Sequence, residues 1–531
     1  MHGFTESSAA RAAATGPVEE LELLLTAAEA YPALERAFLE ARHTISASFR
    51  IFDVSTRLRS PEAREVGEDW FDLLVHTLER GVRVRLILAD FDPIGAADLH
   101  RLSWNARRKL IAACEIARAG SLEVVSALHS ARAGLGARLV LWPGAHGKLR
   151  AVLAELNALS GDARARFLEE APGLARITRT RHDGRIVAVP GVPDLTPATH
   201  HQKMAVFDGR LLYIGGLDLN ERRYDTPRHR RAPERTWHDV HALVRGPVVS
   251  AAEDHLEGFL SIVAGQRPPG PAAPGFLRTL SRPARRAPFR FSPMPVVTEI
   301  ERAHLSRIAA AEHLVYLETQ FFRHLPLAQA LARRAEARPD LRAILVLPAA
   351  PEDVAFENSS GLDVRYGEHL QSRCLGLLYD AFGPDRVLVL SPVQPRRIVD
   401  ADGREALQDA PIIYVHSKVS IFDDRAAILS SANLNGRSMR WDTEAGIELT
   451  AARHVEQIRQ RVMGYWLSRD ADGQVDPEAL DPATAFEHWR VLADLNSRRR
   501  PERREGFLVH YDSDPARKLG LPVPGVPPEI V

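Results

Sequence analysis

The sequence predicts an α/β fold built from two halves of similar construction. One short motif occurs in both halves, and patterns typical of helices and of strands alternate within each half. The 531 residues are also too many for one hydrophobic core. The two motif copies begin at His201 and His416, so the repeated unit has the size of a domain. We therefore expect one α/β layer structure in each half.

Hydrophobic periodicity places similar elements in the same order in both halves. Runs with helical spacing precede short apolar runs, which is the pattern of a helix that leads into a buried strand. The expected helices are 34–43 and 69–80 in the first half and 299–311 and 326–337 in the second, and the expected strands are 44–52, 82–89, 313–318 and 343–347.

The chain is expected to divide at a segment rich in proline, glycine and arginine. This segment, QRPPGPAAPGFLRTLSR, has the composition of a linker. We expect an N-terminal domain at 1–265, a linker at 266–290, a C-terminal domain at 291–500 and an irregular tail at 501–531.

The repeated motif reads HQKMAVFD at 201–208 and HSKVSIFD at 416–423. Each copy consists of histidine, one residue, lysine, four residues and aspartate. The match is specific, because the chain holds only five lysines and two of them, Lys203 and Lys418, fall in the motif. In each copy an apolar run, a polar turn and a second apolar run predict a β-hairpin. Alternate residues of a strand face one side, so the histidine and lysine of each copy point the same way.

These residue types fit the cleavage of a phosphodiester without a metal. A neutral imidazole is a competent nucleophile near neutral pH, and a protonated imidazole can supply a proton to the leaving oxygen. Two compact ammonium groups can stabilise charge on the non-bridging phosphate oxygens. The candidate catalytic residues are His201, Lys203, Asp208, His416, Lys418 and Asp423, and the candidate phosphate ligands are Lys203, Lys418, Ser431 and Asn433. Of these, we expect Asp208 and Asp423 to hold the hairpin turns.

Net charge, cysteine count and hydropathy limit the substrates, disulfides and membrane contacts that we expect. The net charge is zero, whereas proteins that bind nucleic acid usually carry a basic surplus, so we do not expect a nucleic-acid substrate. Cys114 and Cys374 are the two cysteines and give no disulfide framework. The N-terminal residues lack the basic start and apolar core of a signal peptide, and no apolar run reaches the roughly 20 residues of a membrane span. We expect a cytoplasmic protein with at most peripheral membrane contact, and the oligomeric state stays open.

The sequence resembles the phospholipase D superfamily, whose members carry two His-x-Lys-x4-Asp motifs. Its segments are closest to those of the eukaryotic-type phospholipases D, and they occur in that family's order. They are GGLDL at 215–219 with RRYDT at 222–226, TWHDVH at 236–241 with GP at 246–247, YLETQFF at 316–322, and SANLNGRSM at 431–439 followed by Asp442 and Glu444.

This resemblance implies a fold and a division of roles. The fold would be a pseudo-symmetric pair of domains, each a mixed β-sheet flanked by helices, with the active site at their interface. His201 would form a phosphohistidine, and His416 would protonate the leaving alcohol. Supporting carboxylates would fix the two imidazoles, Asp239 behind His201 and Glu444 behind His416. No metal or other cofactor is expected.

The implied activity is that of a phospholipase D acting in lipid degradation. It would hydrolyse glycerophospholipids to phosphatidic acid and a headgroup alcohol, or transfer the phosphatidyl group to another alcohol. Two enzymatic alternatives stay open: a phosphatidyltransferase similar to cardiolipin synthases, and a nuclease of the same superfamily. The intact histidines and lysines argue against an inactive scaffold. A toxin exported without a signal peptide stays open beside a cytoplasmic role.

Overall fold

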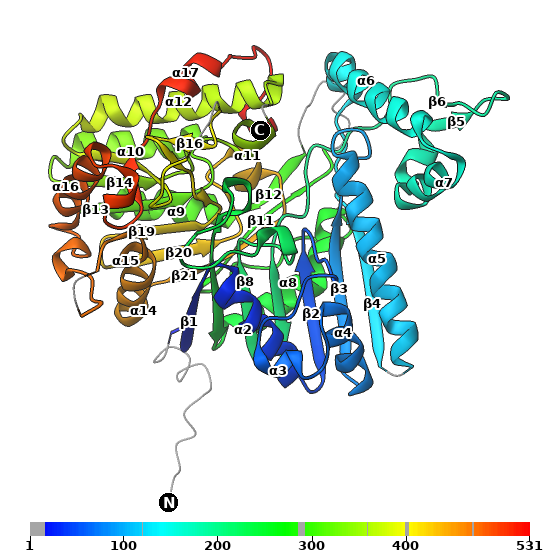
Figure 1. Ribbon diagram of the computed structural model, residues 1–531, viewed down its shortest axis with the longest axis horizontal. Coiled ribbons are helices and arrows are strands. Elements are labelled where there is room, and N and C mark those ends of the chain that lie inside the picture. The colour runs from blue at the N-terminus through cyan, green and yellow to red at the C-terminus, as the bar shows by residue number, and fades with distance from the viewer. Residues whose placement is uncertain (1–15, 119, 285–292, 358, 399–402, 470–471) are drawn as a thin grey trace, which may run out of the picture.

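Two large mixed β-sheets, each flanked by helices, form the body of the protein (Figure 1). The computed structural model describes residues 16–118, 120–284, 293–357, 359–398, 403–469 and 472–531. The first 15 residues, which belong to the N-terminal stretch judged for a signal peptide, and residues 285–292, which include the end of the expected linker, lie outside the described residues. Among the described helices, none has both the length and the apolar character of a membrane span.

The first sheet has the strand order β1-β10-β8-β7-β2-β3-β4. Its strands are β1 (Glu20–Leu25), β2 (Thr44–Phe49), β3 (Arg83–Asp90), β4 (Ser121–Leu128), β7 (Met204–Phe207), β8 (Leu211–Gly215) and β10 (Val240–Arg245). The helices that accompany it are α2 (Thr26–Glu40), α3 (Pro61–Arg64), α4 (Trp70–Glu79), α5 (Ala97–Ala117) and α8 (Val248–Val263).

The second sheet has the order β12-β11-β21-β20-β19-β13-β14-β15-β22. Its strands are β11 (Phe276–Arg282), β12 (Met294–Thr298), β13 (Leu314–Thr319), β14 (Arg342–Val346), β15 (Val387–Pro392), β19 (Lys418–Phe422), β20 (Ala426–Ser430), β21 (Glu444–Leu449) and β22 (Leu508–His510). The helices of this half are α9 (Glu299–Ala310), α10 (Leu325–Ala337), α11 (Glu352–Glu357), α12 (Leu362–Phe382), α13 (Gly436–Arg440), α14 (Ala452–Ile458), α15 (Gly464–Trp466), α16 (Ala485–Arg498) and α17 (Asp514–Leu519).

The duplication seen in the motif extends to the sheets. The order β10-β8-β7-β2-β3-β4 in the first sheet matches β21-β20-β19-β13-β14-β15 in the second. In each set the last three strands run parallel, and the other neighbours pair antiparallel. The predicted α/β class is therefore confirmed, and both sheets are mixed.

Local signals in the sequence located most elements near the site. Asp69 caps α4 by accepting hydrogen bonds from the backbone N–H groups of Phe71 and Asp72, which explains why this helix begins where predicted. Both predicted hairpins are present, as β7–β8 and β19–β20. The first helix is longer than predicted, because α2 begins at Thr26 and runs through Pro32.

One large hydrophobic cluster contains residues of both halves. Met204 and Val206 on one face of β7 belong to the same buried cluster as Val419 of β19, whereas Ala205 and Phe207 on the opposite face pack with residues of α2 and α4. One face of each hairpin is thus buried against the other half. This packing brings together the starts of β7 and β19, where His201 and His416 lie.

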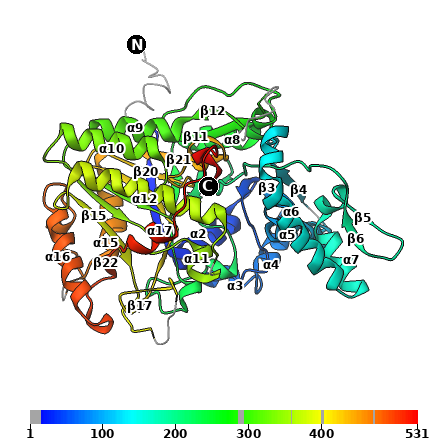
Figure 2. The same ribbon diagram turned by 90° about the horizontal axis from the view of Figure 1, so that it is seen from above.

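Two predicted boundaries differ from the structure. The expected linker contains β11, which pairs with β21 and β12, so part of this segment is an integral strand. Its apolar residues Phe276, Leu277 and Leu280 are buried, and this burial outweighs the linker-like composition of the preceding residues. The expected irregular tail supplies β22, which pairs with β15, and then α17. The end of the described chain lies between the two halves when viewed from above (Figure 2).

An insertion between β4 and β7 forms a separate small unit. It comprises α6 (Leu135–Ala158), α7 (Gly161–Glu170), β5 (Thr178–Thr180) and β6 (Ile186–Ala188), and it has its own apolar cluster. In both views α7, β5 and β6 project from the body, while α6 lies closer to the rest of the protein (Figures 1 and 2).

Candidate active site

Short parallel backbone pairings across the halves position both motif histidines. His200 forms a bridge with Thr443, and the backbone N–H of His201 donates to the carbonyl oxygen of Thr443 at 2.9 Å. In the other half, β18 (Tyr414–Val415) pairs with β9 (Trp237–His238), and the N–H of His416 donates to the carbonyl oxygen of His238 at 2.8 Å. Each histidine therefore follows a strand segment that is held by the opposite half.

This crossed pairing also decides which carboxylate lies behind each imidazole. The Nδ1 atom of His201 lies 2.9 Å from Oε1 of Glu444, and Nδ1 of His416 lies 2.7 Å from Oδ2 of Asp239. The predicted assignment, Asp239 behind His201 and Glu444 behind His416, is wrong. Glu444 follows Thr443 directly and Asp239 follows His238 directly, so the cross-half backbone pairing places each carboxylate next to the histidine of the other half.

Burial disfavours the charged form of both imidazoles. Burial lowers the pKa of His201 well below its ordinary value, and the nearby Lys203 and Arg50 lower it further. Burial also lowers the pKa of His416 well below its ordinary value, with Lys418 as the largest charged contributor. With Nδ1 directed to a carboxylate, each ring keeps Nε2 for a ligand.

The supporting carboxylates and the lysines are fully desolvated, which brings their pKa values toward neutrality. Burial raises the pKa of Glu444 to about 8 against the effect of Lys203, and raises that of Asp239 to about 7 against the effect of Lys418. Burial lowers the pKa of Lys418 to about 7 and also lowers that of Lys203. Strongly shifted pKa values of buried groups are typical of functional sites.

The two lysines lie directly behind the histidines. Nζ of Lys203 donates to the carbonyl oxygen of His201 at 2.6 Å. Nζ of Lys418 donates to the carbonyl oxygen of His416 and lies 3.0 Å from Nδ1 of the same residue. Both lysine side chains are buried. Their charge therefore acts across a desolvated site, where electrostatic effects are strong.

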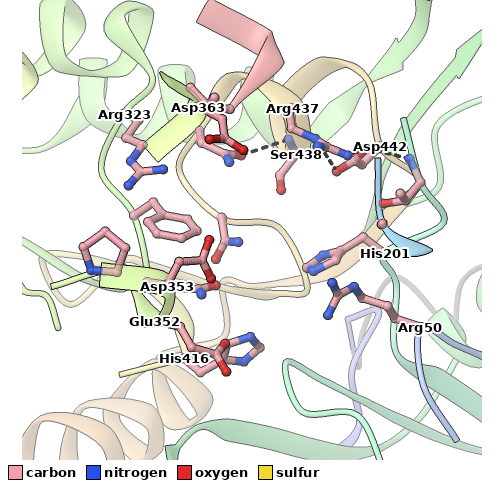
Figure 3. Close-up of a pocket in the computed structure, with 18 of the residues that line it drawn as sticks. Arg50, His201, Arg323, Glu352, Asp353, Asp363, His416, Arg437, Ser438 and Asp442 are labelled. Carbon is pink, nitrogen blue, oxygen red and sulfur yellow. Dashed lines mark hydrogen bonds and ion pairs between the residues drawn. The ribbon is translucent and has the colours of Figure 1, made fainter. Parts of the chain in front are cut away.

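A cavity of about 370 Å³ lies in front of the two imidazoles, and both His201 and His416 line it (Figure 3). The predicted phosphate ligand Asn433 also lines this cavity, and its buried Oδ1 has no hydrogen-bond partner among the described residues. Lys203, Lys418 and Ser431 are absent from the lining and are buried behind it. The charged lining residues that the prediction of the site did not include are Arg50, Arg223, Arg323, Glu352, Asp353, Asp363, Arg437 and Asp442.

Two of the added arginines carried a signal in the sequence. Arg223 and Arg437 lie within the segments RRYDT and SANLNGRSM. Arg437 contacts Asp442 at 3.2 Å, and a buried Nη1 atom of Arg223 has no hydrogen-bond partner among the described residues. Arg50 directly follows β2, and its position at the cavity becomes evident only once the halves are packed.

Ser431 occupies a different position from the predicted one. Its hydroxyl donates to Oε2 of Glu444, so it orients the carboxylate behind His201 and does not face the cavity. The equivalent residue in the first half is Gly216, where an added Cβ atom would lie 2.4 Å from Oδ1 of Asp239. The asymmetry of the repeat therefore has a steric cause: the Asp239 carboxylate fills the space that a side chain at 216 would need.

Asp208 and Asp423 lie in the hairpin turns, outside the cavity lining. The carboxylate of Asp208 accepts three hydrogen bonds of 2.8 Å from the N–H groups of Arg42, His43 and Thr44. Asp423 accepts three equivalent bonds from Glu312, His313 and Leu314. Their inclusion among the catalytic residues is thus wrong, whereas the expectation that they hold the turns agrees with their positive φ angles of 50° and 53°.

A second layer of buried polar groups fixes the loop of the second motif. Glu318 accepts hydrogen bonds from Ser417, from the Tyr316 hydroxyl at 2.6 Å and from Nε1 of Trp466 at 2.7 Å. Nε2 of His238 lies 3.1 Å from the same carboxylate. Because Ser417 stands between His416 and Lys418, this network holds both functional side chains in place. Among the described residues, no group of three or more His, Cys, Asp or Glu side chains could hold a metal ion.

A family model and curated relatives both show similarity to proteins with a phospholipase D-like domain. The family described as "Cardiolipin synthase, PLD-like domain" matches residues 305–466. Phospholipase D beta 2 of Arabidopsis thaliana is 24% identical over 469 residues, covering 62% of this chain and 50% of that protein. Phospholipase D alpha 1 of Brassica oleracea var. capitata is 23% identical over 413 residues, covering 54% and 50%. The chain thus spans about half the length of these curated relatives.

Among solved structures, a phosphatidylserine synthase from Haemophilus influenzae Rd KW20 is similar in fold. The TM-score is 0.50 at 12% sequence identity, and the likeness covers 94% of this chain and 92% of the other. At this identity the likeness concerns the fold alone.

Proposed function

Since the chain belongs to the phospholipase D superfamily, we propose that it cleaves the headgroup phosphodiester of glycerophospholipids through a phosphohistidine intermediate. The observation that carries this proposal is the arrangement of the two motif histidines. They line one cavity, and each is supported by a carboxylate from the opposite half. A nucleophile and a proton donor on two sides of one cavity are what an in-line displacement at phosphorus requires.

In the first step, Nε2 of His201 gives its lone pair to phosphorus and the bond from phosphorus to the headgroup oxygen breaks. That oxygen takes a proton from His416. In the second step, water or an alcohol gives a proton to His416 while its oxygen attacks phosphorus, and the bond from phosphorus to nitrogen breaks. Lys203 and Lys418 stabilise the additional negative charge of each transition state from behind the histidines.

Substrate binding supplies the charge that the proton donor needs. Burial and Lys418 lower the pKa of His416. A phosphodiester brings a negative charge into the same desolvated cavity, and a nearby negative charge raises the pKa of a histidine. Bound substrate therefore favours the protonated form of His416. Asp239, 2.7 Å from Nδ1 of His416, stabilises the resulting imidazolium.

The acidic part of the cavity wall is suited to a headgroup that carries positive charge. Glu352, Asp353 and Asp363 line it together with the aromatic residues Phe321 and Tyr414. Burial and the neighbouring Glu352 and Asp363 raise the pKa of Asp353, so a cationic group placed there would relieve unfavourable repulsion. Choline and ethanolamine headgroups have this charge.

The decisive experiment is product analysis by mass spectrometry after the purified protein has been incubated with vesicles of mixed phospholipids. Phosphatidic acid and free headgroup should appear with the wild type and be absent with His201→Ala. If neither variant forms any lipid product, the proposal is wrong.

A phosphatidyltransferase is the second candidate, because the matching family is described as cardiolipin synthase. A product lipid with two phosphates, formed in the same assay when phosphatidylglycerol is present, would favour it. A nuclease is less favoured, since the net charge is zero. Degradation of DNA or RNA that depends on His201 would instead favour a nuclease over the lipid-cleaving activities.

A further inference from the structure

Arg223 brings a buried and weakly paired positive charge to the catalytic cavity. The residue lines the cavity and is only 8% exposed. Its Nη1 atom has no hydrogen-bond partner among the described residues. In the ion pair with Glu352, Nη2 of Arg223 lies 3.9 Å from Oε2, which is beyond hydrogen-bonding distance. A buried charge is unfavourable unless it is well paired, so an anion in the cavity would stabilise this guanidinium.

Aromatic packing holds the guanidinium near the second motif histidine. Cζ of Arg223 lies 3.7 Å from the centre of the Trp237 ring. The ring of His416 packs against the same indole, with 5.6 Å between the ring centres. Burial is the main cause of the lowered pKa of His416, and the positive charge of Arg223 contributes to it. By contrast, Arg50 lies on the His201 side of the cavity (Figure 3). Arg223 is therefore positioned where a phosphodiester would meet the proton donor.

The motif lysines do not occupy this position. Nζ of Lys203 and Nζ of Lys418 each donate to the backbone carbonyl oxygen of the motif histidine, and neither lysine lines the cavity. Arg437 lines the cavity, but its guanidinium is already hydrogen-bonded to Asp442. The guanidinium of Arg223 lacks such a close partner. Its planar set of N–H donors matches the oxygens of a phosphate, and it stays charged across the pH range in which proteins are folded.

We propose that Arg223 binds a non-bridging oxygen of the substrate phosphate next to His416 and stabilises the negative charge that develops there in the transition state. This inference rests on the proposed function, because it adds a contact to the same reacting group. Packing on Trp237 orients the guanidinium before the substrate binds, so little reorganisation is needed during the reaction. The two lysines act from behind the histidines, whereas Arg223 acts by direct contact.

Binding of inorganic phosphate tests this contact without any need for turnover. Isothermal titration calorimetry compares the wild type, Arg223→Met and a matched control, Arg222→Met. Arg222 is the adjacent arginine; it pairs with Glu352 at 2.7 Å, its side chain is 49% exposed, and it does not line the cavity. Loss of the charge-assisted contact should weaken phosphate binding by about tenfold or more in Arg223→Met, while Arg222→Met should bind like the wild type. Since both arginines pair with Glu352, a role through Glu352 alone would weaken binding in both variants.

Equal phosphate affinity in Arg223→Met and the wild type would overturn the proposal, and so would a wild type that binds no phosphate. Arg223→Lys keeps the charge but loses the planar set of donors, and it replaces the first variant if that variant does not fold. Its phosphate affinity should also fall below that of the wild type.

A kinetic readout separates contact with the substrate from a structural role. With the water-soluble diester bis(4-nitrophenyl) phosphate, kcat/KM should fall in Arg223→Met, and guanidinium ion at a non-denaturing concentration should restore part of it. A loss that is not restored, together with unchanged phosphate affinity, would show a structural role and overturn the proposal.

Lipid cleavage is judged separately. If the wild type forms no lipid product but binds phosphate through Arg223, the proposed function fails and the anion contact stands. If the wild type cleaves lipids and Arg223→Met binds phosphate equally well, this inference alone fails.

Discussion

Glu444 in the second half supports His201 in the first half, with 2.9 Å between Oε1 and Nδ1. The reciprocal pair, Asp239 and His416, crosses in the other direction at 2.7 Å. Each half therefore supplies the carboxylate that contacts the imidazole of the other half. The site depends on the packing of both sheets, since each Nδ1 atom contacts a carboxylate of the opposite half and, among the described residues, no carboxylate of the same half takes this place.

The crossed pairing predicts which chemical step each carboxylate affects. Asp239→Asn weakens His416 as a proton donor, so it should slow the release of an alcohol by about 100-fold or more. It should slow the release of 4-nitrophenolate much less, because that leaving group needs no proton. Glu444→Gln weakens the nucleophile and should slow both substrates by a similar factor. Steady-state rates with the two leaving groups measure this. The reverse pattern would contradict the crossed assignment of roles.

Lys418 should set the alkaline limit of activity. Burial lowers its pKa to about 7, so its positive charge is present below that pH and is lost as the pH rises through it. We expect kcat/KM to fall over this range. In Lys418→Arg the charge persists to high pH, so the alkaline limb should move upward by more than one unit even though the rate is lower. Lys109→Arg, outside the cavity lining, is the control and should leave the profile unchanged.

Asp208 should contribute to stability and not to the chemical step. Burial by itself raises its pKa, but three backbone N–H groups outweigh this and lower it. A carboxylate whose pKa is lowered by folding stabilises the folded state at pH values above its pKa in the unfolded chain. This stabilisation is lost as the pH falls through the pKa that the carboxylate has in the folded protein. Asp208→Asn should therefore cost about 1–2 kcal/mol in the free energy of unfolding at pH 7, and less below about pH 4.

Denaturant titrations at several pH values measure this difference, and kcat of the folded variant is the companion measurement. The wild-type side chain is partly exposed, so the N–H groups regain water and the loss stays modest. A fall in kcat of about 100-fold with unchanged stability would contradict the structural role.

Asp353 should contribute to headgroup preference. Neutralising it in Asp353→Asn removes one of the four carboxylates that line the cavity, so cleavage of phosphatidylcholine should fall several-fold relative to that of phosphatidylglycerol. Competition between the two lipids in one vesicle population gives this ratio directly. An unchanged ratio would remove Asp353 from headgroup recognition.

Local patterns predicted the parts of the site that are local in the chain. The hairpin that follows Lys203 depends on one strand and one turn and is present as predicted, whereas the expectation that the histidine and lysine point to the same side is wrong, because only the histidine lines the cavity. The same holds for the second motif copy. By contrast, the partner of each carboxylate depends on backbone pairing between residues such as His200 and Thr443, which lie far apart in sequence. No local signal distinguishes the crossed arrangement from the uncrossed one.

Composition also gave a wrong prediction for the segment that contains β11, because burial in the sheet outweighs the linker-like composition. Proline and glycine at 266–275 indicate a linker, yet Phe276 begins β11 directly afterwards, because Phe276 and Leu280 are buried by the sheet. Arg50 gave no signal of its own, since an arginine after a strand is ordinary on a surface. Its position at the cavity follows from the association of the two halves.

The most direct test of the account is the identification of the covalent intermediate. His416→Ala, given an activated diester with a 4-nitrophenolate leaving group, can form the intermediate but loses the base that activates water. Rapid quenching and peptide mapping by mass spectrometry should then find the phosphoryl adduct on His201, and none in His201→Ala. An adduct on His416 of the wild type, or turnover that persists in His201→Ala, would contradict the account.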